Sequence, residues 1–207
     1  MPNPDLVGRS SATRTRGRPP VVDERRAQIV DAFLALVAEH GLEAVTIGAV
    51  AESAGVARTA VRHFVGNRPE LIDAAVEVVA GRYRETVAGS VGDTPTADAL
   101  VSFLFSHRWV RERSIDDLAF DALHEQAARD PGTRALVGGV YELMVAELVA
   151  ALVRDGGGRR SARYEDAAYQ VVCLAEHNVA LQALGFSAAR SRAAGSLARR
   201  IAAEAII

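Results

Sequence analysis

The chain has 207 residues, enough for one large domain or two small ones whose core needs no disulfide or metal. Hydrophobic residues make up 49% of it and charged residues 24%, which excludes general disorder, collagen and coiled-coil rods. The single cysteine, Cys173, excludes a disulfide framework within one chain. We expect a cytoplasmic protein without a membrane partner, because the sequence shows neither a signal peptide nor an apolar run of about 20 residues.

The net charge of −2 hides an asymmetry along the chain. All 24 basic residues are arginine; nine of them fall in residues 1–68 against seven acids, whereas the other 15 are accompanied by 19 acids. The N-terminal third is therefore mildly basic. Alanine is the commonest residue and strand-forming residues are sparse, which predicts an all-α fold.

Residues 1–22 are predicted to form a flexible basic arm, because they are rich in proline and arginine and poor in apolar residues. Arg16 and Arg18 lie in an Arg-Gly-Arg-Pro run that resembles the core of an AT-hook. Flexible arginine arms enter narrow A·T-rich minor grooves. A solvated tail without function is the alternative interpretation.

Caps, breakers and apolar spacing predict about nine helices and no strand in the rest of the chain. Asn67 before Pro69, and Ser114 before Asp117, are typical helix starts. The expected helices cover residues 23–40, 46–53, 57–64, 68 to between 87 and 92, 97–110, 115–129, 133–154, 162–184 and 187–206. A tight turn at Gly185 would make the last two antiparallel neighbours.

The third predicted helix and its predecessor carry the spacing of a helix-turn-helix. Ala51 is small enough for two helices to cross closely, Gly55 suits a turn with positive φ, and Val61 would anchor the second helix from beneath. The rest of this small core would comprise Phe33, Val37, Ile47, Val50 and Val56. The exposed face would present hydrogen-bond donors suited to base edges and phosphates: Arg58, Thr59, Arg62 and His63.

Residues 23 to about 80 resemble the DNA-binding domain of the TetR family of transcriptional regulators. The likeness rests on Thr-Ile-Gly-Ala-Val-Ala-Glu-Ser-Ala-Gly-Val-Ala-Arg at 46–58 and Arg-His-Phe-Val-Gly-Asn-Arg-Pro-Glu-Leu at 62–71. The resemblance implies a helix-turn-helix head over 23–68 and a ligand-binding and dimerisation body over 69–207. It further implies a homodimeric repressor that a small-molecule effector releases from a pseudo-palindromic operator. The DNA-binding residues expected on this basis are Arg16, Arg18, Thr46, Arg58, Thr59, Ala60, Arg62, His63 and Arg68.

The sequence departs from the family pattern at two of these positions. Where the recognition helix usually carries Gly-Thr-Leu-Tyr, this chain has Thr-Ala-Val-Arg at 59–62. Arg62 thus replaces a phosphate-contacting tyrosine, which keeps a DNA-binding group but alters the expected choice of sequence. Arg68 stands where the family usually has lysine and keeps a positive charge near a phosphate.

Six residues of the body are candidates for a ligand cavity because they combine apolar surface with polar groups: Phe103, His107, Phe120, His124, Tyr141 and Tyr169. Trp109, Met144, Cys173 and His177 are weaker candidates, and ordinary core packing is the alternative for each. We expect no metal, cofactor or catalytic residue, since the chain has no phosphate loop, GxSxG elbow or HExxH pair. An enzyme or binding protein with a vestigial head is the alternative to the regulator.

The last two predicted helices are rich in apolar and small residues and are expected to form a four-helix dimer interface. The small residues include Ala167, Ala168, Ala175, Ala194, Ala198 and Ala202, and the apolar ones include Val171, Leu174, Val179, Leu181, Leu184, Leu197, Ile201 and Ile206. The alternative is that these residues complete the core of one subunit. Glutamate at positions 198 and 201 should split the dimer if the interface is correct.

Overall fold

The computed structural model describes residues 20–207, and within this range all regular structure is helical, which confirms the all-α prediction. The elements are α1 (Pro20–His40), η1 (Leu42–Ala44), α2 (Ile47–Ser53), α3 (Arg58–Phe64), α4 (Arg68–Val91), α5 (Ala97–Leu104), α6 (His107–Arg111), α7 (Ile115–Ala127), α8 (Pro131–Asp155), α9 (Ala162–Ala183) and α10 (Ala188–Ile206). The predicted minor-groove residues Arg16 and Arg18 lie outside the described residues.

Helix starts follow the predicted caps. The Asn67 side-chain oxygen accepts a hydrogen bond from the Glu70 backbone amide, and the Glu70 carboxylate accepts one from the Asn67 backbone amide. Helix α4 therefore begins with a capping box. Ser114 and Asp117 form the same reciprocal pair at the start of α7. The predicted helix over 97–110 is divided, because the Ser106 side chain accepts from the Trp109 amide and starts the short α6.

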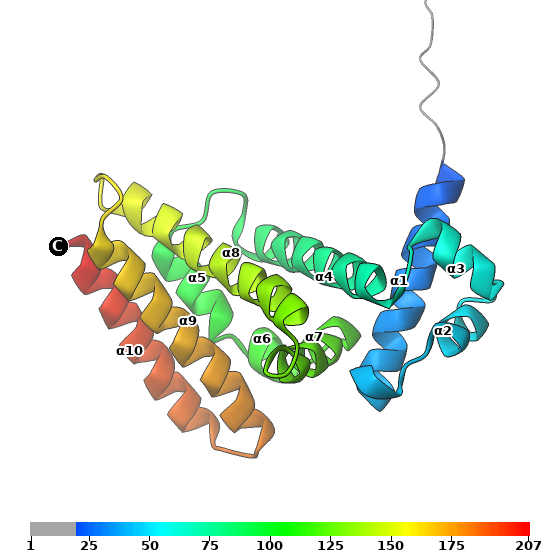
Figure 1. The fold of residues 1–207 in the computed structure, drawn as a ribbon. Helices are drawn as coiled ribbons and strands as arrows, with labels where there is room; N and C mark the ends of the chain where they lie inside the picture. The colour runs from blue at the N-terminus through cyan, green and yellow to red at the C-terminus, as the bar shows by residue number, and fades with distance from the viewer. Residues whose placement is uncertain (1–19) are drawn as a thin grey trace, which may run out of the picture.

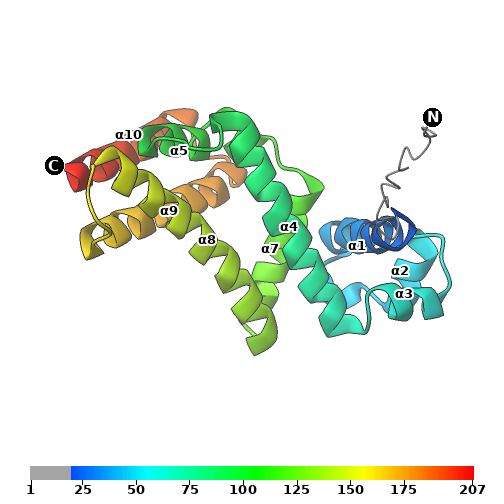
Figure 2. The same cartoon turned by 90° about the horizontal axis from the view of Figure 1, so that it is seen from above.

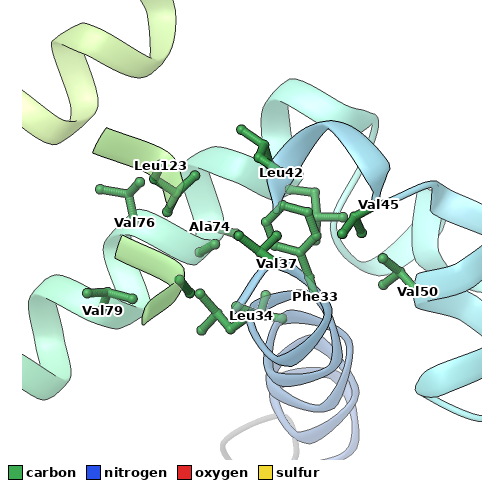
Figure 3. Packing of buried hydrophobic residues seen from close by; sticks show 14 of the residues in the cluster. Phe33, Leu34, Val37, Leu42, Val45, Val50, Ala74, Val76, Val79 and Leu123 are labelled. Carbon is green, nitrogen blue, oxygen red and sulfur yellow. The ribbon is translucent and has the colours of Figure 1, made fainter. Parts of the chain in front are cut away.

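Helices α1, α2 and α3 form a small head around α1. Phe33 and Val37 of α1 lie between Val50 on the α2 side and Ala74 of α4 and Leu123 of α7 (Figure 3). The apolar cluster of the head therefore continues into α4 and α7, across the boundary at residue 68 expected from the sequence. Burial of this shared cluster fixes the head on the body.

Helix α4 leads from the head into a helical body, with α8 beside it and the α9–α10 pair at the far end of the molecule (Figures 1 and 2). Gly185 has a φ of 89°, as the tight turn between α9 and α10 requires. The Asn178 amide donates to the Ser191 hydroxyl at 3.0 Å inside this pair. The antiparallel arrangement of the last two helices is thus confirmed.

Helix α8 is long and apolar enough, by length and composition, to cross a membrane. Its apolar run is nevertheless interrupted by Glu142 and Glu147. Its side chains Val140, Met144, Leu148 and Leu152 are buried within the molecule, and α8 packs against α4, α7 and α9. We therefore interpret α8 as the central core helix of the body.

The structure corrects the predicted assignment of the last two helices. Val171 of α9 and Ala198 of α10 are almost completely buried within one subunit. The same holds for Ala167, Ala168, Ala175 and Ala202. These residues face inward because α9 and α10 pack on each other and on α5 and α8. They complete the core of the subunit, so glutamate at position 198 would disrupt folding instead of splitting a dimer.

Candidate nucleic-acid interface and ligand cavity

The connection between α2 and α3 has the geometry of a helix-turn-helix. Gly55 adopts a φ of 62°, a left-handed conformation that glycine reaches without steric cost. Ala51 and Val61 are buried against α1, as their spacing predicts. The Gln28 side chain of α1 donates to the Ala54 carbonyl at 2.8 Å, which ties α1 to the turn.

Helix α3 turns one polar face to solvent. Arg58, Thr59, Arg62 and His63 are exposed on it, whereas Ala60 is half-buried. Within residues 20–207 neither Arg58 nor Arg62 has an ion-pair partner, unlike Arg82, Arg113 and Arg129 of the body. Both guanidinium groups can therefore donate to phosphate oxygens or to guanine.

The start of α2 lies next to this face. The Thr46 hydroxyl accepts from the Ala49 amide at 3.1 Å, which caps α2, and its own proton remains available to a phosphate. The Arg58 guanidinium lies over Gly48, where any Cβ would collide with it. Gly48 thus allows Arg58 to cross the first turn of α2.

Arg68 has a different position from the one expected. Its guanidinium donates to the backbone carbonyls of Leu42 and Val45. These bonds fasten the first turn of α4 to the segment that precedes α2. Because the donors are directed into the protein, the geometry favours a positioning role for Arg68 over a direct phosphate contact.

The body encloses a cavity of about 590 Å³ between α4, α5, α6, α7, α8 and α9. Phe103, Phe120, His124 and Tyr141 line it, so four of the six predicted residues come together. The other two do not contribute. His107 is exposed, with its Nδ1 3.4 Å from Glu112 Oε1, and Tyr169 is 63% exposed on the outward face of α9.

Two groups that the sequence did not indicate, the Glu176 carboxylate and the Tyr83 phenol, line the cavity together with the predicted Tyr141. The Tyr141 hydroxyl donates to Glu176 Oε2 at 3.3 Å. Burial and the neighbouring Asp121 raise the pKa of Glu176 to about 7, against the hydrogen bond from Tyr141. Burial, Glu147 and Glu176 raise the pKa of Tyr83. All three groups are therefore poor at carrying negative charge in this cavity.

Comparison with known proteins agrees with the head geometry. Residues 29–75 match the model of bacterial regulatory proteins of the tetR family. The chain is 30% identical over 94 residues to the HTH-type transcriptional repressor KstR2 of Rhodococcus jostii, over 41% of this chain and 46% of the relative. It is 27% identical over 115 residues to the HTH-type transcriptional regulator BetI of Rhizobium meliloti, over 55% of this chain and 57% of the relative.

These matches span about half the length of the two curated relatives. The fold agrees over more of the chain: a TetR-family regulator from Cytophaga hutchinsonii has a TM-score of 0.72 at 14% identity, with 91% of this chain and 98% of that one covered. The head of this chain is therefore similar in sequence to tetR-family regulatory proteins over residues 29–75, and the described chain shares the fold of such a regulator.

One arginine of the chain joins the head to the cavity. Arg82 of α4 lines the cavity and donates to Asp116 of α7 at 2.8 Å and to Asp31 of α1. Its guanidinium therefore contacts the head and two walls of the cavity at once. Sequence reasoning missed Arg82 and Glu176 because charged residues on a helix usually lie on a solvated face, and only tertiary packing brings these into a cavity.

Proposed function

We propose that the protein is a homodimeric, ligand-responsive regulator of transcription that binds a pseudo-palindromic operator. The observation that carries this proposal is the exposed α3 face, where Arg58 and Arg62 have no acidic partner in the described part of the chain. In a helix-turn-helix of this geometry the second helix enters the major groove. Similarity of the head to tetR-family regulatory proteins supports regulation of transcription over catalysis.

The dimer interface we propose is the exposed side of α9 and α10. Of the interface residues expected from the sequence it keeps the exposed Leu184 and Leu197 and leaves out the buried ones such as Val171 and Ala198. Tyr169 and Ile207 are further large apolar side chains exposed on this pair. Exposed apolar side chains on two adjacent helices are typical of a protein interface. A two-fold contact through it would bury both pairs as a four-helix bundle and leave the two heads free.

Dimerisation matters because one short helix reads only a few base pairs. Two α3 helices in successive major grooves roughly double the free energy of discrimination against other sequences. The Thr59-Ala60-Val61-Arg62 segment differs from the usual family pattern, so the operator is expected to differ as well.

The small-molecule effector would act through α4. A ligand that fits the cavity better when α4 and α7 are displaced shifts the population toward that arrangement. Arg82 would transmit the shift, since it bonds Asp31 of the head and Asp116 of the cavity wall. The spacing of the two heads would then no longer match the operator, and repression would be relieved.

The basic arm predicted at residues 1–22 is proposed to add minor-groove contacts. Up to four arginines would then displace counterions from DNA. Deletion of residues 1–20 should weaken operator binding and reduce the slope of log affinity against log salt concentration. An unchanged slope would show that the arm contributes nothing to binding.

The experiment that tests the function is a gel shift with the DNA upstream of the protein's own gene. We expect specific retardation that weakens as salt rises, because phosphate contacts release counterions. Selection of bound sequences from random DNA would then define the operator. Absence of specific binding even at low salt would contradict the proposal and favour a binding protein whose head does not engage DNA.

A further inference from the structure

Most charged residues of the cavity wall are paired within residues 20–207; the exceptions are the exposed Arg108 and the half-buried Glu176. Arg82 pairs with Asp116, Arg113 with Asp121 at 2.9 Å, and Arg129 with Glu125 at 3.4 Å. Asp117 also lies 4.0 Å from Arg113, and Glu112 lies 3.4 Å from His107. In the part of the chain that the structure describes, Glu176 has no basic partner.

The only hydrogen bond to the Glu176 carboxylate from the described residues comes from Tyr141, at a long 3.3 Å. A carboxylate can accept about four hydrogen bonds, so Glu176, which lines the cavity, has acceptor capacity left for a ligand. A carboxylate withdrawn from bulk water and left without a cation is costly. Glu176 must therefore either take up a proton or be stabilised by a positive group supplied from outside.

Aromatic rings line the space around this carboxylate. Tyr141 contacts Phe120 and His124, with ring centroids 5.7 Å and 5.6 Å away. On the other side Trp109 contacts Tyr83 and Phe103, with centroids 5.2 Å and 5.3 Å away. Aromatic faces attract cations through the ring quadrupole, most strongly in sites shielded from water.

We propose that the cavity binds an organic cation, an amine or ammonium group on an apolar body, with its positive charge against Glu176. This deepens the proposed function, since it assigns the chemical class of the effector. The cavity of about 590 Å³ has room for a drug-sized molecule. Arg108 is the one arginine of the wall without an ion pair in the described residues, but it is exposed and its charge is screened by water.

Binding of a cation beside Glu176 should be accompanied by a measurable release of protons. Burial raises its pKa to about 7 in the free protein, so near neutral pH the carboxyl group is partly protonated. A bound cation favours the carboxylate and lowers this pKa, so binding must release protons. The charged and titratable groups that face Glu176 are Tyr83 of α4, Arg113, Asp117 and Asp121 at α7, Tyr141 of α8 and His177 of α9.

Among these groups only Arg113 favours the carboxylate through its charge, and it is already bonded to Asp121. Affinity for a cation should therefore increase as pH rises from 6 to 8, while affinity for a neutral molecule should not. This difference in the pH dependence of affinity distinguishes a charge-specific site from an apolar one.

The test uses the full chain without DNA and three compounds of similar size: phenylbutylammonium, phenylbutanol and phenylbutyrate. Binding is followed by the fluorescence of Trp109, the single tryptophan of the chain and a cavity residue, and by calorimetry in buffers of different ionisation enthalpy. We expect the amine to bind at least about tenfold more tightly than the alcohol and to release protons at pH 7. The carboxylate should bind most weakly.

Glu176→Gln, which mimics the protonated side chain, should abolish both the preference for the amine and the proton release. Glu142→Gln is the matched control, since Glu142 is exposed on α8 outside the cavity, and should change neither. Equal affinities for the three compounds, or an amine preference that persists in Glu176→Gln, would overturn the inference. Because no DNA is present, amine binding without operator binding would instead contradict the proposed function alone.

Discussion

Two residues illustrate how sequence reasoning about contacts succeeds and fails. Arg62 is exposed on α3 as its helical position predicts, because the buried Val61 next to it fixes the rotation of the helix. Arg68 has the same charge and lies in the same head, yet its guanidinium is bonded to two backbone carbonyls. Helical periodicity gives the face of a residue, but its partners depend on segments distant in sequence.

Arg58→Ala and Arg62→Ala should each weaken operator binding, since both remove a donor from the exposed face of α3. A bidentate base contact contributes about 1 to 3 kcal/mol to discrimination. Fluorescence anisotropy on operator and random DNA measures the change, with circular dichroism to show that helical content is kept. Arg129→Ala, far from α3 and exposed, is the control; unchanged binding in both head variants would refute the assignment of α3.

Glu176 should make the unliganded protein less stable as pH rises. Its pKa is about 7 in the folded chain against an ordinary 4.5, so the folded state holds the proton more strongly than the unfolded state. The penalty is absent below about pH 4.5 and complete above about pH 7. Relative to Glu176→Gln, the wild type should lose of the order of 2 to 3 kcal/mol of unfolding free energy between these limits.

Urea unfolding of both proteins at a series of pH values provides the measurement. Parallel pH profiles for the wild type and Glu176→Gln would show that Glu176 is ionised without cost, and would remove the reason to expect proton release on ligand binding.

At the scale of elements, the head is held to α4 by two kinds of contact. Leu71 and Ala74 in the first turns of α4 are buried in the apolar cluster of α1. Arg68 adds directional bonds to the segment between η1 and α2. Together they set the angle at which α4 leaves the head, and hence the distance between two heads in a dimer.

Arg68→Ala should therefore lower stability by about 1 to 3 kcal/mol, because two partly buried carbonyls lose a charged donor. The affinity for DNA should decrease by the same factor for all DNA sequences, since no base contact is removed. Arg84→Ala is the control: Arg84 also donates to a carbonyl, that of Ala80, but within its own helix. A loss confined to one DNA sequence would indicate that Arg68 reads a base.

At the scale of the whole molecule, five of the eight large apolar side chains exposed within residues 20–207 belong to the α9–α10 hairpin or its ends: Tyr169, Leu184, Phe186, Leu197 and Ile207. This pair of helices lies at the end of the molecule opposite the head (Figure 1). The inward face of the same pair is fully used by the subunit core. Assembly through the outward face is therefore compatible with a folded monomer, and point substitutions there can test assembly without disturbing folding.

The double variant Leu184→Glu, Leu197→Glu should be a monomer in light scattering at micromolar concentration, whereas the wild type should be a dimer. Introduced charges in an apolar interface cannot be solvated or paired. Leu118→Glu is the control, since Leu118 is comparably exposed, at 45%, on α7. A monomeric wild type would refute the dimer and the symmetric operator with it.

The sequence by itself determined the local features: the all-α class, the caps at Asn67 and Ser114, the turn at Gly55 and the exposed face of α3. Each depends on residues within one or two helical turns, where propensity and periodicity act directly. Resemblance over residues 23 to about 80 also indicated the family whose model matches residues 29–75.

Tertiary structure decided the rest. Only packing of six helices brings Glu176, Tyr83 and Arg82 into one cavity with the predicted Phe120 and Tyr141, and only the docking of α9 on α8 makes Ala168 inward and Tyr169 outward. Apolar residues occur on both the buried and the exposed side of α9, as Ala168 and Tyr169 show, so composition could not distinguish core from interface. The charge environment of Glu176 likewise depends on Asp121 and Arg113, more than 50 residues away in sequence.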